Sequence, residues 1–220
     1  MRNSVIDSIE KNKIIVIVRG VEKDKLIPLA EAMYNGGIRL LEITYSADKP
    51  QSDEQTAESI AMLSKHFQGR MYIGAGTVLN EKQVELTHKA GGKFIISPNT
   101  NKKVIEKTRE LEMVSMPGAY TASEIQEAHE YGADFVKLFP ITSVGTEYVK
   151  AVKAPLSNIK LMAVGGINED NMVDYLNAGA TGFGIGSNIV NKKLIDNDDF
   201  CGITELAERY TAVIEKWQHI

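Results

Sequence analysis

The segment AMYNGGIRLLEI, residues 32–43, contains the change of pattern on which the prediction of the fold depends. It includes the end of a helix-like stretch that opens on Asp24 and stops at Gly36 and Gly37, two typical helix-ending residues. The run that follows, IRLLEI, is short and mostly apolar, as expected of a strand buried in a parallel sheet. The segment therefore predicts a helix, a tight turn and a buried strand in succession.

The same succession recurs in LTHKAGGKFII (86–96) and LNAGATGFGI (176–185). Along the whole chain, eight short apolar runs alternate with helix-like stretches, one of which opens with a capping box of Thr121 and Glu124. Eight strands alternating with helices predict an α/β fold in which a parallel sheet closes into a (β/α)8 TIM barrel. The runs are 14–18, 38–43, 71–75, 93–96, 113–116, 134–138, 160–164 and 182–185.

An open, doubly wound sheet is the main alternative fold. It usually has fewer strands and needs a nucleotide-binding motif, whereas GAG at 74–76 is too short for a dinucleotide fingerprint. Two further helices are predicted outside the alternation, at 3–10 and 204–216. Because no linker or low-complexity segment interrupts the chain, we expect a single barrel domain over 1–220 with an extra N-terminal helix.

The composition excludes several classes of function. Hydrophobic residues make up 43% of the 220 residues, enough for one substantial core. The net charge of −4 comes from interspersed acidic and basic residues, which argues against a nucleic-acid partner. The apolar runs are too short to span a membrane, and residues 1–13 lack the apolar core of a signal peptide. The only cysteine, Cys201, excludes an intrachain disulfide, and we expect a cytoplasmic protein.

The segment DFVKLFP (134–140) contains the sixth run, and one of its residues, Lys137, is unexpected in a buried strand. Glu42 stands in the same way in the second run, and the active site of a barrel lies at the carboxyl ends of its strands. In a dry pocket the ammonium form of a lysine is disfavoured, so its amine can form a Schiff base while a carboxylate moves protons. The alternatives are a buried ion pair, a lysine that caps a strand end, or a lysine that binds an anion as a charge.

No histidine stands at the ends of the predicted strands. The four histidines fall in helical stretches or the C-terminal tail, which argues against a histidine base and against a metal site. No cofactor is expected either. The residues at the strand ends are Arg19, Glu42, Thr44, Thr77, Pro98, Asn99, Pro117, Lys137, Gly165, Gly166 and Ser187.

Two glycine-containing turns suggest a phosphate site. AVGGIN (163–168) and GIGSNIV (184–190) place glycines where strands seven and eight lead into helices, so that backbone N–H groups can approach an anion. The alternative is that these glycines only make tight turns. In GAGTV (74–78), Thr77 could donate its hydroxyl to a carboxylate or cap the helix that follows.

Seven motifs together resemble the class I aldolases that act on 2-keto-3-deoxy-6-phosphogluconate (KDPG) and 4-hydroxy-2-oxoglutarate (KHG). The resemblance extends over residues 10–190 and implies a (β/α)8 barrel, a homotrimer, and cleavage of a 2-keto-4-hydroxy acid. The products would be pyruvate and an aldehyde such as glyceraldehyde 3-phosphate or glyoxylate. The motifs are LEIT, GAGTVLN, FIISPN, MPGAYTASE, FVKLFP, VGGIN and GIGSNIV.

The resemblance also implies roles for single residues. Lys137 matches the Schiff-base lysine of the family, and Glu42 matches its general acid and base. The other matches are Thr77, Pro98 and Phe139 in the pyruvate pocket, Gly165, Gly166 and Ser187 at the phosphate, and Arg19 at a basic position after the first strand.

The chain departs from the family pattern after the second strand. Where the family has Leu-Arg-Thr, this chain has Tyr45 and Ser46 in a longer loop, so the arginine that holds the substrate carboxylate is missing. Arg19, Tyr45 or Lys49 could compensate. The turn AVGGI also lacks a hydroxyl that PTGGI supplies, and SPN (97–99) replaces SPG or SPH.

These departures leave other functions open. One is an aldolase of the same mechanism for a different 2-keto-3-deoxy sugar acid. Another is a phosphosugar isomerase or epimerase, although the strand ends lack the histidine base or metal that such an enzyme needs. A third is a barrel that binds a sugar phosphate or keto acid without catalysis, although binding alone does not require both Lys137 and Glu42.

Overall fold

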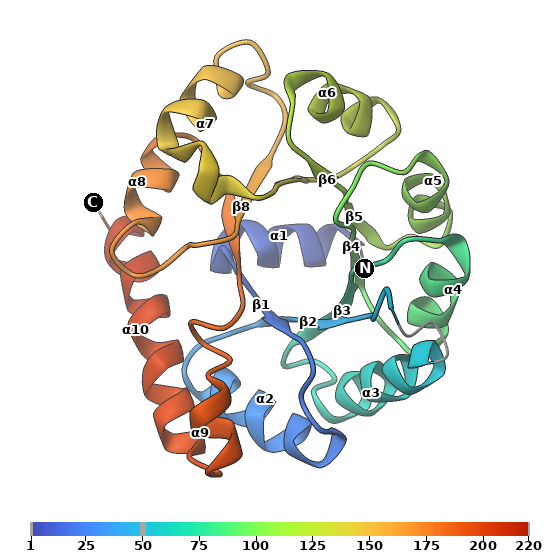
Figure 1. Ribbon diagram of the computed structural model, residues 1–220, viewed down its shortest axis with the longest axis vertical. Coiled ribbons are helices and arrows are strands. Elements are labelled where there is room, and N and C mark those ends of the chain that lie inside the picture. The colour runs from blue at the N-terminus through green and yellow to red at the C-terminus, as the bar shows by residue number, and fades with distance from the viewer. Residues whose placement is uncertain (1, 49–51, 220) are drawn as a thin grey trace.

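The computed structural model describes residues 2–48 and 52–219. Nine strands form one sheet, and all of their pairings are parallel (Figure 1). Strands that follow one another in sequence pair with each other, except β5 and β6, and the first strand also pairs with the last. The strands are β1 (Ile14–Val18), β2 (Leu40–Thr44), β3 (Tyr72–Gly76), β4 (Phe94–Ile96), β5 (Val114–Met116), β6 (Gly118–Ala119), β7 (Val136–Leu138), β8 (Leu161–Val164) and β9 (Gly182–Ile185).

Pro117 follows the fifth predicted strand (113–116) and separates β5 from a second short strand, β6, that the sequence does not predict. Proline has no N–H to donate to a ladder, so regular pairing is interrupted at this residue. β5 pairs with β4 on one side and β6 pairs with β7 on the other. The carbonyl of Pro117 still accepts a hydrogen bond of 2.8 Å from the N–H of Lys137. The barrel therefore closes through this segment, and the predicted (β/α)8 fold is confirmed.

Helices follow the strands and surround the barrel, and their ends are set by local side chains. Thr121 and Glu124 form the predicted capping box of α6. α8 begins only at Met172, after a turn in which the side chain of Asn168 accepts the N–H groups of Asp170 and Asn171. The helices are α1 (Arg2–Asn12), α2 (Leu26–Asn35), α3 (Asp53–His66), α4 (Glu81–Lys89), α5 (Lys102–Glu110), α6 (Ala122–Glu130), α7 (Gly145–Lys153), α8 (Met172–Asn177), α9 (Lys192–Asp196) and α10 (Phe200–Gln218).

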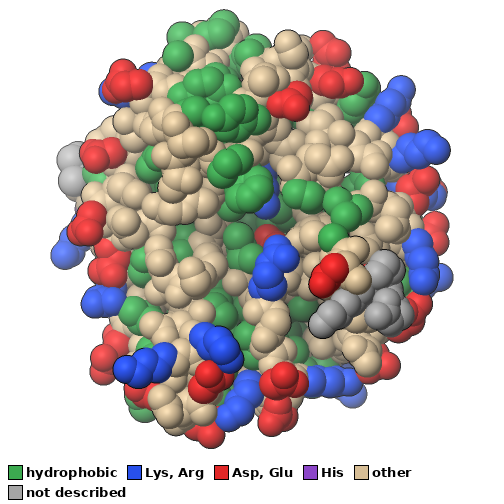
Figure 2. Space-filling view, in the orientation of Figure 1, with side chains coloured by type: hydrophobic (Ala, Val, Ile, Leu, Met, Phe, Trp, Pro, Cys, Tyr) green, Lys and Arg blue, Asp and Glu red, His purple; other side chains and the backbone are tan. Residues whose placement is uncertain are grey.

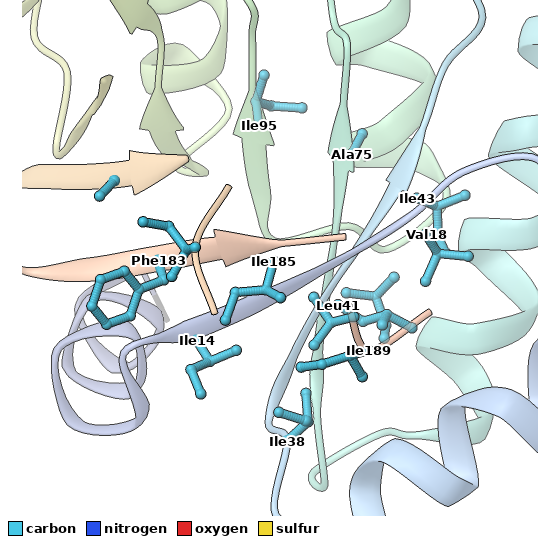
Figure 3. Close-up of a cluster of buried hydrophobic side chains, with 14 of the residues drawn as sticks. Ile14, Val18, Ile38, Leu41, Ile43, Ala75, Ile95, Phe183, Ile185 and Ile189 are labelled. Carbon is cyan, nitrogen blue, oxygen red and sulfur yellow. The ribbon is translucent and has the colours of Figure 1, made fainter. Parts of the chain in front are cut away.

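Alternate residues of each strand enter two different layers of the core. Outward-facing side chains, among them Ile14, Leu41, Ala75 and Ile185, pack between the strands and the surrounding helices (Figure 3). Inward-facing apolar residues fill the barrel itself. They include Ile15, Leu40, Phe94, Ile96, Val114, Met116, Phe135 and Met162.

The predicted N-terminal helix is present as α1, and it closes the amino-terminal end of the barrel. It lies behind the strands, across the centre of the ring in Figure 1, and its Val5 and Ile9 join the inner core. Arg2 forms an ion pair with Asp134, whose carboxylate also accepts 2.9 Å hydrogen bonds from Arg109 and from the N–H of Ser115. Within the described residues, α1 therefore covers the amino-terminal end of the barrel.

Removing the Ile9 side chain tests this closure. Ile9 is 0% exposed, so Ile9→Ala should lower the free energy of unfolding by about 2–5 kcal/mol, the usual cost of such a cavity. Urea denaturation measures the change. Ile6→Ala on the same helix is the control, because Ile6 is only partly buried and should cost less. Equal losses for the two variants would contradict the inward orientation of Ile9.

Candidate active site

Lys137 lies in the middle of β7 with its side chain inside the barrel. Its neighbours Val136 and Leu138 belong to the outer layer, so the alternation of the strand turns Lys137 inward together with Phe135. The residue is 9% exposed. The lysine that was unexpected in a buried strand is thus a buried group inside the barrel.

Glu42 of β2 reaches the same interior and is 2% exposed. Glu42 and Lys137 line a narrow cavity of about 10 Å³, which has room for about one water molecule. The rest of the lining is apolar and comes from most of the other strands: Ile15, Ile17, Ile96, Met116, Met162, Val164 and Gly184. The two titratable groups therefore share one largely dry compartment.

The two groups do not neutralise each other by direct contact. No oxygen of Glu42 lies within 4.0 Å of Nζ of Lys137, and Oε2 of Glu42 has no hydrogen-bond partner among the described residues. The alternative of a buried ion pair is therefore wrong. An unpaired buried carboxylate oxygen is costly, and here it faces a cavity that also contains an amine. Such a group is available to a ligand.

Burial shifts both pKa values toward the neutral forms. Desolvation lowers the pKa of Lys137; the charge of Glu42 opposes this shift, and the charge of Arg19 adds to it. Desolvation raises the pKa of the Glu42 carboxyl, and the positive charges of Lys137 and Arg19 oppose that shift. The free amine of Lys137 and the protonated carboxyl of Glu42 are therefore both favoured more in this cavity than they would be in water at the same pH. This combination suits nucleophilic attack with proton transfer.

Arg19 comes to this site from the end of β1. Its guanidinium donates a 2.9 Å hydrogen bond to the hydroxyl of Thr77, at the end of β3. Thr77 has a φ of 55°, a left-handed conformation that is unusual for a β-branched residue and often marks a functional site. The helix that follows Thr77 is capped by Asn80, so Thr77 is not its cap.

The two other residues predicted for the pyruvate pocket lie just after the carboxyl ends of β7 and β4. Phe139 follows β7, is 40% exposed, and its ring centroid lies 4.7 Å from Nζ of Lys137. Pro98 follows β4, and its carbonyl packs so closely on Gly118 that a Cβ there would lie 2.3 Å from the oxygen. Figure 2 shows this end of the barrel: apolar side chains surround its centre, where a basic side chain is partly visible.

The two glycine-containing turns supply free backbone donors. Gly165 and Gly166 have φ values of 101° and 69°, which glycine adopts without strain. Within the described residues, no hydrogen bond uses the backbone N–H of Gly166, Ser187 or Asn188. Unpaired N–H groups of this kind can bind an anion.

Sequence reasoning missed two residues that shape these turns. The side chain of Asn188 donates a 2.7 Å hydrogen bond to the carbonyl of Ile167 and so ties the two turns together. Thr142 packs against Gly166, where a Cβ would lie only 1.8 Å from its methyl group. Asn188 is adjacent to Ser187 in GIGSNIV, but no pattern in the sequence indicates that it bridges to the preceding turn.

The described residues of the loop that replaces the family arginine bring no new cation into the cavity. Tyr45 is 0% exposed, and its hydroxyl lies 3.0 Å from that of Thr87 and donates a 3.3 Å bond to the carbonyl of Gln83, so it faces α4. Ser46 donates to Asp48. Compensation by Tyr45 is therefore wrong, and Lys49 lies outside the described residues. Arg19 remains as the described candidate.

The histidines lie outside the barrel interior. His66 pairs with Glu31 on the outer helices, and His129 contacts Asn158. Over residues 2–48 and 52–219, no three His, Cys, Asp or Glu side chains gather as a metal site would require. No helix in the same ranges is long and apolar enough to cross a membrane.

Comparison with known proteins assigns a family. Residues 5–206 match the family described as KDPG and KHG aldolase. The 2-dehydro-3-deoxy-6-phosphogalactonate aldolase of Escherichia coli is 34% identical over 81% of this chain and 85% of its own length. The 2-dehydro-3-deoxy-phosphogluconate aldolase of Haemophilus influenzae is 31% identical over 96% of this chain and 97% of its own.

A solved structure shows the same fold with a ligand. The KDPG aldolase of Legionella pneumophila, in which pyruvate was captured as a covalent carbinolamine, superposes with a TM-score of 0.81 and 30% identity. The match covers 90% of this chain and 94% of that one.

The charges around Lys137 predict opposite responses in two variants. Arg19→Met removes a positive charge and should raise the pKa of Lys137, whereas Glu42→Gln removes a negative charge and should lower it. Competitive labelling with acetic anhydride over a range of pH, followed by peptide mass analysis, measures this pKa. The wild-type midpoint should lie below the ordinary value of 10.5. Shifts of the same sign in the two variants would contradict the arrangement.

Proposed function

Because this chain belongs to the KDPG and KHG aldolase family, we propose that it cleaves 2-keto-4-hydroxy acids through a Schiff base on Lys137. Aldolases are lyases, and the chain is an enzyme of this class. The observation that carries the residue assignment is the buried Lys137 facing an unpaired Glu42 carboxylate across a cavity of about 10 Å³. The pyruvate adduct seen in the Legionella pneumophila relative supports the same chemistry.

The first half of the reaction uses the lowered pKa of Lys137. Its neutral amine attacks the C2 carbonyl of the keto acid and forms a carbinolamine, which loses water to give a protonated imine. The imine is an electron sink for the C3–C4 bond. When the C4 hydroxyl loses its proton, that bond breaks, the aldehyde leaves, and the electron pair remains in an enamine.

Glu42 moves the protons of this sequence, directly or through the one water for which the cavity has room. Its raised pKa makes both protonation states accessible, so it can accept the C4 hydroxyl proton and later return a proton to C3 of the enamine. Water then adds to the imine, and pyruvate is released. The amine of Lys137 is regenerated for the next cycle.

In the proposed reaction, Arg19 and Thr77 hold the substrate carboxylate. Their mutual hydrogen bond keeps a guanidinium and a hydroxyl together at the mouth of the cavity. An arginine can bind a carboxylate with two parallel hydrogen bonds. We propose that Arg19 takes over from the missing family arginine, and that Pro98 and Phe139 form the apolar sides of the pyruvate pocket.

A phosphorylated sugar acid is the substrate class that fits the far end of the site. Gly165, Gly166 and Ser187 form the two turns with unpaired N–H groups, and Asn188 fixes their spacing. Relatives named for phosphogluconate and for phosphogalactonate acids both match this chain, and these acids differ in configuration at C4. KHG, which has no phosphate, is the smaller alternative substrate. A homotrimer and a cytoplasmic location stay predictions.

Replacing Lys137 tests the mechanism. Lys137→Ala should fold normally but lose turnover by several orders of magnitude, because no other amine in the cavity can form the imine. Reduction with borohydride in the presence of pyruvate, followed by intact-mass and peptide analysis, should show an adduct on Lys137 of the wild-type protein only. Lys150→Ala on the surface is the control. An adduct on another residue would contradict the assignment, and an adduct without cleavage of any aldol would favour a binding protein.

A substrate panel tests the class. The wild-type protein should cleave 6-phosphorylated 2-keto-3-deoxy acids with a kcat/KM at least about tenfold above their unphosphorylated forms, because charge-assisted hydrogen bonds contribute about 1.5–3 kcal/mol. Asn188→Ala should reduce this advantage more than it reduces cleavage of the unphosphorylated acids. The gluco and galacto epimers and KHG are assayed in parallel. Equal kcat/KM with and without phosphate would contradict the proposed phosphate site.

A further inference from the structure

Beyond Tyr72, the inner face of β3 carries no side chains. Ile73 and Ala75 of this strand face the outer layer, so Tyr72, Gly74 and Gly76 face the barrel, and Tyr72 packs against the inner core. In the pairing of β2 with β3, Glu42 lies opposite Gly74, and Thr44 lies opposite Gly76. A bare strip of backbone therefore runs beside Glu42 toward the open end of the barrel.

Side chains of the two neighbouring strands occupy this strip. A Cβ at Gly74 would lie 2.3 Å from the ring of Phe94, which comes from β4. A Cβ at Gly76 would lie 1.5 Å from Oε1 of Glu42 and 2.1 Å from its Cδ. The three atoms nearest to this position all belong to the Glu42 side chain. The carboxylate therefore fills the space that any other residue at 76 would fill.

We propose that Gly76 is a positioning residue of the aldol reaction. Because Gly76 has no side chain, the Glu42 carboxylate can occupy the space beside it and so lie at the open end of the cavity. The inference rests on the proposed function only in the role given to Glu42. Although the Cα of Glu42 is paired with Gly74, its carboxylate lies over Gly76, two residues nearer the carboxyl end of β3. The side chain is thus extended along β3 toward the end where a substrate enters.

The Glu42 carboxylate has no other place of the same size along β3. Phe94 blocks the strip in the other direction, and the cavity in front of it has room for about one water molecule. A methyl group at residue 76 would therefore drive the carboxylate into that cavity, toward Lys137. Proton transfer to C3 and from the C4 hydroxyl would lose its geometry, whereas the carbonyl could still reach the amine of Lys137.

Gly76→Ala separates these two steps. The borohydride-trapped pyruvate adduct on Lys137 should still form, but exchange of the pyruvate C3 protons in D2O, followed by NMR, should fall by about 100-fold or more. Gly74→Ala is the matched control on the same strand, because its methyl group meets Phe94 instead of the carboxylate. Its ratio of exchange to adduct formation should stay at the wild-type value.

Exchange that survives in Gly76→Ala, or falls equally in Gly74→Ala, would overturn the proposal. Equal losses of adduct and exchange in Gly76→Ala would also overturn it, because they would indicate a general packing defect. If the wild-type protein itself forms no adduct, the proposed function is wrong. This outcome is distinguishable from failure of the Gly76 proposal, which requires a wild-type protein that forms the adduct.

A stability cycle tests the spatial claim without any substrate. Gly76→Ala should lower Tm in the wild-type background but change it little in a Glu42→Ala background, where the carboxylate is gone. This comparison holds even if Gly76→Ala alone does not fold, since the double variant should then recover folding. Equal losses of stability in the two backgrounds would show that the methyl group clashes with something other than Glu42.

Discussion

Burial of one lysine amine in a closed apolar barrel is the constraint on which the rest of this structure depends. Lys137 is turned inward by the alternation of β7, and the barrel around it is plugged at its amino-terminal end by α1. Lys137 is accordingly only 9% exposed. Desolvation therefore lowers the pKa of Lys137, and the same closed geometry directs a substrate carbonyl to the one side from which the amine is accessible.

The charges near Lys137 offset part of the desolvation of its ammonium form but do not abolish the lowering of its pKa. Glu42 offsets part of the desolvation from a distance greater than that of an ion pair, and Arg19 acts in the opposite direction from the end of β1. A direct Glu42–Lys137 contact would stabilise the ammonium form and remove the nucleophile. The bare strip of β3 at Gly74 and Gly76 keeps the carboxylate beside the amine, in the same cavity but out of contact with it.

The sequence predicted the architecture well because its signals are local. Each of the eight apolar runs contains a strand or part of one, and the capping box at Thr121 opens α6 as expected. Local patterns failed where a side chain acted across elements or within a turn. Asn168 holds a turn before α8, Pro117 is followed by an additional short strand, and the hydroxyl of Tyr45 faces α4 instead of the cavity.

Taken alone, the sequence determined the barrel, the inward lysine and the family, since periodicity and motif order are properties of the chain itself. Only the tertiary structure decided how the groups meet: that Glu42 and Lys137 share a cavity without pairing, that Arg19 bonds to Thr77, and that Asn188 joins two turns. These contacts depend on the register between strands and on the absence of a side chain at Gly76. Distances between residues far apart in the chain are fixed by packing, and a linear pattern does not contain them.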